Sequence, residues 1–197
     1  MRFKKFAVVI LALSFAATTG FAQPEKYEID PVHSNVGFTV RHMVIAKVIG
    51  KFNEFSGAIV YDEQDITKSS VTAIIKTASI DTDNERRDNH LRSADFFDAE
   101  NHPEISFFSK KIEKRDNAYV AIGDLTMRGV TKEIELPFTI LGTVKDQRGN
   151  TRIGIEAGVK LNRFDYEVTW DRALDDGNLV VSNEVEVNLS LAAVMRK

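Results

Sequence analysis

Hydrophobic and polar residues alternate along much of the chain, most regularly in its C-terminal part. Apolar residues occupy every second position in 132–142, 152–161 and 184–191, and mostly polar, charged or glycine residues lie between them. In 152–161, one face carries only apolar side chains, from Ile153, Ile155, Ala157, Val159 and Leu161. A period of two is typical of antiparallel strands with one dry face and one solvent-exposed face. The pattern therefore predicts a protein built mainly of antiparallel β-strands.

The earlier part of the chain shows the same pattern less regularly. Val36, Phe38 and Val40 form an apolar face between Ser34 and His42, and further candidate strands cover 50–62, 69–80, 104–112 and 118–128. Residues that favour tight reversals separate the later strands, at Asp116-Asn117, Arg128-Gly129, Arg148-Gly149-Asn150 and Asp175-Asp176-Gly177-Asn178. We therefore expect about eight strands.

One segment departs from the alternation and predicts a helix. Thr82-Asp83-Asn84-Glu85 has the spacing of a capping box, in which Thr82 caps the helix start and Glu85 reaches back to it. We expect a short helix over 83–93 that sits on one side or end of the sheet. Leu91, Phe96 and Phe97 would anchor it to the apolar wall.

Long strands that are dry on one face close into a barrel most economically, because closure removes exposed edges. The predicted fold class is all-β: an eight-stranded antiparallel barrel with one short helical insertion, formed by a single domain over 23–197. A two-sheet sandwich is the alternative architecture. Eight strands is the size at which a barrel interior can hold one small ligand.

Residues 1–22 resemble a secretory signal peptide. Arg2, Lys4 and Lys5 precede an apolar run over 6–17, and small residues lead to Ala22. We expect cleavage after Ala22 and a periplasmic or secreted protein. Loss of the three basic residues lowers the net charge from −3 to −6. An acidic domain lacks the electrostatic footprint of a nucleic-acid-binding protein, and its sign opposes binding to anionic lipid headgroups.

The sequence offers few candidates for catalysis or metal binding. The chain has no cysteine, which excludes thiol chemistry, iron–sulfur clusters and cysteine zinc sites. His33, His42, His90 and His102 lack metal-ligand spacing, and no nucleotide-binding or hydrolase motif occurs. His33 is interpreted as a hydrogen-bonded turn residue. His42 continues the Val36/Phe38/Val40 face and should point inward, either as a core residue or as a polar contact for a ligand headgroup.

Charged residues also gather around the predicted helix: Asp81, Asp83, Glu85, Asp88 and Asp95 with Arg86, Arg87 and Arg92. Paired carboxylates can perform acid–base catalysis. Interleaved charges near a helix more often form a solvated face with weak ion pairs, which is the interpretation adopted here. We therefore expect no catalytic residues and no metal.

Ordered motifs along 27–163 resemble the YceI-like family. They are Tyr27-Glu28-Ile29-Asp30 with His33-Ser34, Gly50-Lys51-Phe52 with Phe55-Ser56-Gly57, Ser79-Ile80-Asp81-Thr82, His90-Leu91-Arg92-Ser93 with Asp95-Phe96-Phe97-Asp98, Arg128-Gly129-Val130-Thr131-Lys132, and Asn162-Arg163. The resemblance implies a lipocalin-like barrel, a periplasmic location and amphiphilic ligands with long tails, such as polyisoprenoids or quinone-like molecules. It implies no catalytic residues. One departure lies after Asn162-Arg163, where the family has an aromatic residue followed by glycine and this chain has Tyr166-Glu167.

The leading hypothesis is a lipid carrier or reservoir that needs no cofactor. The predicted tunnel lining consists of Phe38, Val40, His42, Phe52, Phe55, Phe96, Phe97, Phe107, Leu125, Phe138, Ala157 and Trp170. Two alternatives stay open: an enzyme acting on an isoprenoid-like substrate through His42 or the helix charges, and an interaction protein of a stress or export pathway with a filled barrel. A transient membrane contact and a dimer are compatible with each of these hypotheses.

Overall fold

The computed structural model describes residues 24–43, 45–116, 118–171 and 180–196, so the expected signal segment and the turn at 175–178 lie outside the described residues. The first six strands are β1 (Glu25–Ile29), β2 (Asn35–His42), β3 (Ala46–Phe52), β4 (Phe55–Tyr61), β5 (Ser70–Lys76) and β6 (Ile80–Asp81). The helix α1 (Glu85–Arg92) precedes the longer strands β7 (Glu104–Arg115), β8 (Ala118–Met127), β9 (Val130–Lys145), β10 (Thr151–Asn162) and β11 (Val181–Met195).

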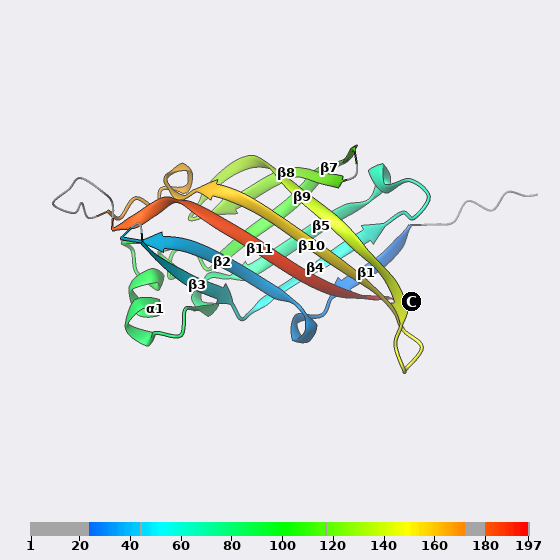
Figure 1. Cartoon of the computed structure of the whole chain (residues 1–197), viewed down its shortest axis with the longest axis horizontal. Coiled ribbons are helices and arrows are strands. Elements are labelled where there is room, and N and C mark those ends of the chain that lie inside the picture. Colours follow the sequence, from blue (N-terminus) through cyan, green and yellow to red (C-terminus); the bar gives the residue numbers. More distant parts are fainter. Residues whose placement is uncertain (1–23, 44, 117, 172–179, 197) are drawn as a thin grey trace, which may run out of the picture.

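These segments form a closed eight-stranded antiparallel barrel (Figure 1). Closure depends on β1, which pairs with β4 along one edge and with the C-terminal end of β11 along the other. The N-terminal part of β11 pairs with β2 instead, so β1 and β2 share one position in the barrel wall. In the same way, β3 and β4 share the next position, because β4 pairs with β1 and β3 pairs with β2. The closed hydrogen-bonding order confirms the barrel over the sandwich.

Three breaks in the strands explain why eight barrel positions contain eleven strand segments. Between β1 and β2, a 3₁₀ turn covers Pro31–His33, where proline cannot donate to the ladder. The prediction of one strand over 50–62 was wrong, because Asn53 and Glu54 interrupt it between β3 and β4. The strand predicted over 69–80 also ends early, at a 3₁₀ turn over Thr77–Ser79.

The helix is present, but its predicted cap was wrong. Asn84 is the N-cap, and its side-chain oxygen accepts a hydrogen bond from the Arg87 backbone N–H at 3.0 Å. Thr82 is buried, and its hydroxyl donates to Oδ1 of Asp88 at 2.5 Å. Asp88 therefore holds Thr82 in the core, and the helix starts later than the capping-box pattern predicted. Within the described residues, no helix is long and apolar enough to cross a membrane.

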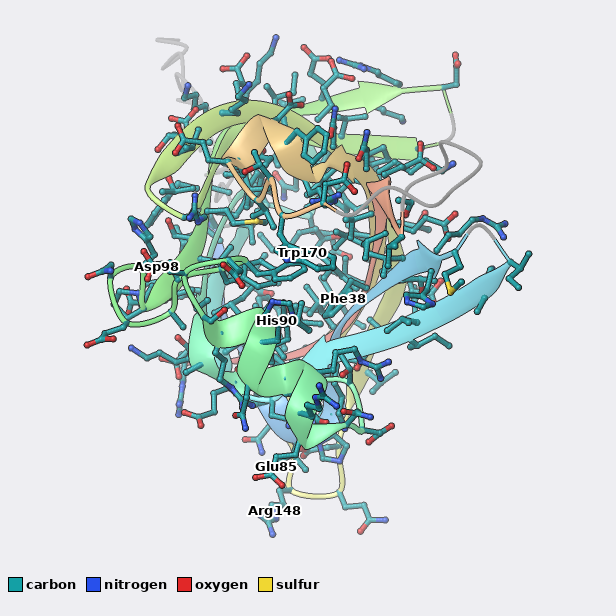
Figure 2. All side chains as sticks on the ribbon, turned by 90° about the vertical axis from the view of Figure 1, so that its left-hand side faces the viewer. Phe38, Glu85, His90, Asp98, Arg148 and Trp170 are labelled. Carbon is teal, nitrogen blue, oxygen red and sulfur yellow. The ribbon has the colours of Figure 1, made fainter. Side chains whose placement is uncertain are left out.

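The two ends of the barrel differ. α1 lies at one end, and the C-terminus lies at the other (Figure 1). At the C-terminal end, a packed cluster of Tyr27, Ile59, Ile153, Ile155 and Ala193 fills the interior. Tyr27, Ile153 and Ala193 are each 1% exposed, so this end is sealed by side chains. At the other end, His90 of α1 and Trp170 lie over the barrel interior (Figure 2).

Candidate functional site

A cavity of about 390 Å³ occupies the barrel interior between the sealed end and α1. This volume lies within the range of small-molecule sites, about 300–1,000 Å³. All twelve residues of the predicted tunnel lining border the cavity. Ala157 is among them: it pairs with Leu189 on β11 and Phe138 on β9, and all three side chains face the cavity. The structure therefore supports the inward direction of these residues, while their contact with a ligand stays a prediction.

The wall of the cavity is almost entirely apolar, and aromatic rings contribute much of it. The ring centroids of Phe38 and Phe52 are 5.9 Å apart, and those of Phe52 and Phe97 are 6.0 Å apart. Such spacings are typical of favourable aromatic pairs. The chain Phe38–Phe52–Phe97 connects the strand wall to the segment that follows α1. An apolar ligand that enters the barrel would meet a continuous aromatic surface.

A cluster of three rings covers the open end. The ring centroids of His90 and Phe96 lie 4.9 Å apart, and those of Phe96 and Trp170 lie 5.2 Å apart. Nε2 of His90 is 3.0 Å from Oδ2 of Asp95. Figure 2 looks onto this end of the barrel, with His90, Trp170 and Phe38 gathered near its centre. This cluster forms the mouth of the cavity.

Polar groups that border the cavity are few, and several lie toward this mouth. His42 borders the cavity as its position on the Val40 face predicted. Arg87, His90 and Arg163 also border it, and they were absent from the predicted set. Two of them could have been predicted from the sequence. Arg87 and His90 share a helix face with Leu91, which was predicted to face the wall. Among these polar groups, His42, Arg87 and His90 are the side chains that an amphiphile headgroup at the mouth would meet.

Arg163 is the most unusual of these groups, because it is buried without a carboxylate in hydrogen-bonding distance among the described residues. Its guanidinium donates instead to backbone carbonyls, at 2.7 Å to Val168 and 2.7 Å to Trp170, with a further bond at 3.1 Å to Ser182. Burial lowers the pKa of Arg163. These bonds fasten the Trp170 segment to the start of β11, so Arg163 positions the rim of the mouth.

Tyr166, which borders the cavity and ends the 3₁₀ turn that Arg163 begins, is 2% exposed. Among the described residues, its hydroxyl has no hydrogen-bond partner. Burial raises its pKa to about 12.

The Tyr166-Glu167 departure from the family pattern has a clear backbone consequence. A 3₁₀ turn over Arg163–Tyr166 ends at Glu167, which has φ 58° and ψ 20°. This is the left-handed region, where glycine is the least strained residue. The turn keeps its left-handed end despite the larger residue, and the Glu167 carbonyl accepts a hydrogen bond from Nη1 of Arg128 at 2.7 Å.

The charged residues around α1 hold the helix in place. The interpretation of this group as a solvated face was wrong for Asp88, which is 5% exposed and bonds to Thr82. Arg87 donates to the Thr82 carbonyl at 2.6 Å, and Arg92 donates to the Ala78 and Ile80 carbonyls, each at 2.7 Å.

Elsewhere, Nδ1 of His33 lies 2.9 Å from Oδ2 of Asp30, as expected for a hydrogen-bonded turn residue. Within the described residues, no three His, Cys, Asp or Glu side chains are grouped to hold a metal.

Together, the fold and the cavity define a closed β-barrel with an apolar interior site and a small polar mouth. The family model of the YceI-like domain matches residues 27–193, so the chain belongs to the YceI-like family. A UPF0312 protein of Photorhabdus laumondii is 36% identical over 175 residues, which cover 88% of this chain and 91% of that protein.

Solved structures of other proteins share this architecture. The crystal structure of a Campylobacter jejuni YceI protein matches with a TM-score of 0.68 and 28% identity, covering 96% of this chain and 100% of that one. The structure of a polyisoprenoid binding domain from Saccharophagus degradans matches with a TM-score of 0.63 and 15% identity, covering 86% and 98% of the two chains. At that identity, the second match shows a shared fold.

Proposed function

We infer that this protein binds a long-chain apolar lipid inside its barrel, either a polyisoprenoid or an amphiphile of similar shape such as a quinone-like molecule. The observation that carries the inference is the apolar cavity itself, which runs from the sealed end to the ring cluster at the mouth. An interaction protein with a filled barrel would pack this space with side chains. The fold shared with the polyisoprenoid binding domain of S. degradans also supports the choice of ligand.

The physical chemistry of the wall favours a long flexible tail. Each buried CH₂ group contributes roughly 0.8 kcal/mol, so several isoprene units outweigh the cost of ordering the tail. A wall of this kind distinguishes chain lengths weakly, since one methylene changes affinity only modestly. Selection of the headgroup falls to the few polar side chains that border the cavity, His42, Arg87 and His90 among them.

The proposed role is that of a carrier or reservoir in the periplasm or after secretion. The signal-like segment at residues 1–22 motivates the location. N-terminal sequencing of protein recovered from the periplasm tests it, with Gln23 as the expected first residue. A binding function is preferred to catalysis because the carboxylates near the mouth are engaged in holding α1 or lie at the surface, as Asp88 and Asp95 do.

Mass spectrometry of organic extracts from the purified protein tests the proposal. We expect a co-purifying lipid with a long apolar tail, and uptake of added polyprenol by protein from which lipid has been removed. Protein that yields no lipid and takes up no polyprenol would show that the proposed function is wrong. Turnover of an isoprenoid-like substrate, lost in His42→Ala, would favour the enzyme instead.

A further inference from the structure

The hairpin formed by β2 and β3 has one face that borders the cavity and one face that is exposed. Val40, His42 and Val48 border the cavity from its inner face. On the tip and outer face, Ile45 is 86% exposed, Ile49 is 70% exposed and Met43 is 43% exposed. These three are among only seven large hydrophobic side chains that are exposed in the described part of the chain. Apolar groups concentrated on one small protruding element mark a site of interaction.

Basic residues flank this apolar tip. Arg41 and Lys47 are exposed and lie directly opposite each other in the β2–β3 register. Like charges in directly opposite positions destabilise a sheet, so the pair brings no benefit to folding. Lys51 follows on the same outer face of β3, with Nζ 3.9 Å from Oδ2 of Asp81. The outer face of the hairpin is thus locally basic on a protein whose net charge is −3.

The hairpin lies at the rim of the cavity mouth. It ends at the same end of the barrel as α1 (Figure 1), and when that end is viewed directly the hairpin extends sideways from the barrel, to the right of the ring cluster (Figure 2). The backbone N–H of Met43 donates to the Val180 carbonyl at 2.8 Å, and Val180 itself borders the cavity. A surface that the tip contacts would therefore lie next to the entrance of the cavity.

We propose that the β2–β3 hairpin docks the protein on an anionic lipid bilayer. Met43, Ile45 and Ile49 enter the interfacial layer, and Arg41 and Lys47 bind the acidic headgroups. Apolar insertion combined with basic residues is the combination that gives reversible membrane attachment. The acidic remainder of the protein is repelled by the same surface, which holds the barrel upright with its mouth toward the bilayer. The inference rests on the proposed function, since a protein that exchanges lipid needs such a contact.

A second copy of this chain fits the surface less well than a bilayer does. Specific protein interfaces bury roughly 1,200–2,000 Å² in total, far more than three apolar side chains supply. In a symmetric contact through this hairpin, the Arg41 and Lys47 pairs of two copies would also approach each other. An anionic bilayer can bind both the apolar side chains of the tip and the basic pair.

Vesicle flotation tests the proposal, with protein recovered after export from a bacterial host and vesicles of phosphatidylcholine with or without 25% phosphatidylglycerol. The apolar variant is Ile45→Ser/Ile49→Ser, and the charge variant is Arg41→Gln/Lys47→Gln. Matched controls lie on the β9–β10 hairpin at the sealed end: Leu141→Ser/Val144→Ser, which are 63% and 64% exposed, and Lys145→Gln/Arg148→Gln. All variants share one N-terminus, so differences between them report on the hairpins.

We expect the apolar variant to lower the partition constant by roughly tenfold or more. The charge variant should lower it by about fivefold per charge on anionic vesicles and leave binding to neutral vesicles unchanged. The controls should match the unmodified protein.

Equal binding by hairpin and control variants, or no vesicle binding at all, would overturn the proposal. So would a dimer in sedimentation that only the apolar variant dissociates, since the hairpin would then join two copies. Lipid content, measured separately on the same samples, shows whether the proposed function itself has failed.

Discussion

The imidazole of His90 stands edge-on to the indole of Trp170, with ring centroids 5.3 Å apart and ring planes at 88°. His90 belongs to α1, whereas Trp170 follows the 3₁₀ turn after β10. The contact therefore joins the helix to the opposite rim across the mouth of the cavity. Anything that enters or leaves the barrel at this end passes these two rings.

Trp170 should report directly on the occupancy of the cavity. It is the only tryptophan in the chain, and its side chain borders the cavity. A long-chain lipid brominated along its tail should quench the emission of lipid-free protein in a saturable way, because the bromine atoms contact the indole. In the double variant Trp170→Phe/Glu156→Trp, the indole stands on the outward face of β10 and should stay unquenched. Equal quenching in both proteins would place the lipid outside the barrel.

A carboxylate network at the sealed end predicts a pH dependence of stability. Nη1 of Arg152 lies 2.7 Å from Oδ2 of Asp30, and its Nε lies 3.0 Å from Oδ2 of Asp146. The hydrogen bonds from Arg152 and His33 lower the pKa of Asp30 to about 2. Because the folded-state pKa is lowered, the stabilisation is fully present above the ordinary pKa of 3.8 and is lost as the pH falls toward 2.

Urea denaturation of Asp30→Asn measures this contribution. We expect the free energy of unfolding to fall by about 1–2 kcal/mol at pH 6, and the difference from the unmodified protein to shrink toward zero near pH 2. The control is Glu184→Gln, which removes an exposed pair with Lys160 and should change stability little at either pH. A difference for Asp30→Asn that is constant with pH would show that the ionised carboxylate is not responsible.

Glu167 carries a backbone cost that glycine would remove. Its φ of 58° places a side chain in the left-handed region at the end of the 3₁₀ turn. Glu167→Gly should therefore raise the free energy of unfolding by about 0.5–1 kcal/mol. The matched control Glu167→Gln keeps the side chain and removes the charge, and it should bring no gain. An equal gain in both variants would assign the effect to loss of the carboxylate and not to the backbone, although the pairing of this carboxylate with Nη1 of Arg128, 4.0 Å away, favours a loss.

Periodicity predicted the long strands well because one face of each strand contacts the apolar barrel interior and the other contacts water. β10 is the clearest case: alternation alone placed Ile153, Ile155 and Ala157 on the inward face, where the structure has them. The helix boundary was harder, because both Thr82 and Asn84 can cap a helix. The choice between them depends on Asp88, which draws Thr82 into the core through a tertiary contact that local patterns do not contain.

The mouth shows the limit of sequence reasoning most clearly. Arg163 and Tyr166 read as ordinary charged and aromatic residues, yet both are buried. Their roles depend on backbone carbonyls such as that of Trp170 and on the fold that brings β10 and β11 together. Whether the aromatic residues fill the barrel or line a cavity also depends on its diameter, which composition does not determine.

A substitution at Ala157 distinguishes a barrel interior that holds lipid from one that is a packed core. Its small side chain faces the cavity between Phe138 and Leu189. Ala157→Trp would put an indole into space that the lipid tail is proposed to use, so extracted lipid should fall sharply. The barrel should still fold, because the indole replaces lipid. In a packed core, the same substitution would cost roughly 1–3 kcal/mol or more through overpacking.

The control for Ala157→Trp is its neighbour on the same strand. Glu156 is exposed and pairs with Thr139 and Ser190 on the outer face, so Glu156→Trp adds the same indole outside the barrel. It should leave both lipid content and the melting temperature of lipid-free protein unchanged. The carrier proposal requires that only Ala157→Trp loses lipid while both variants keep their melting temperature. A collapse of stability in Ala157→Trp, with no lipid recovered from the unmodified protein, would mean that the interior is a core. Undiminished lipid in Ala157→Trp would show that the tail does not occupy the space beside Ala157.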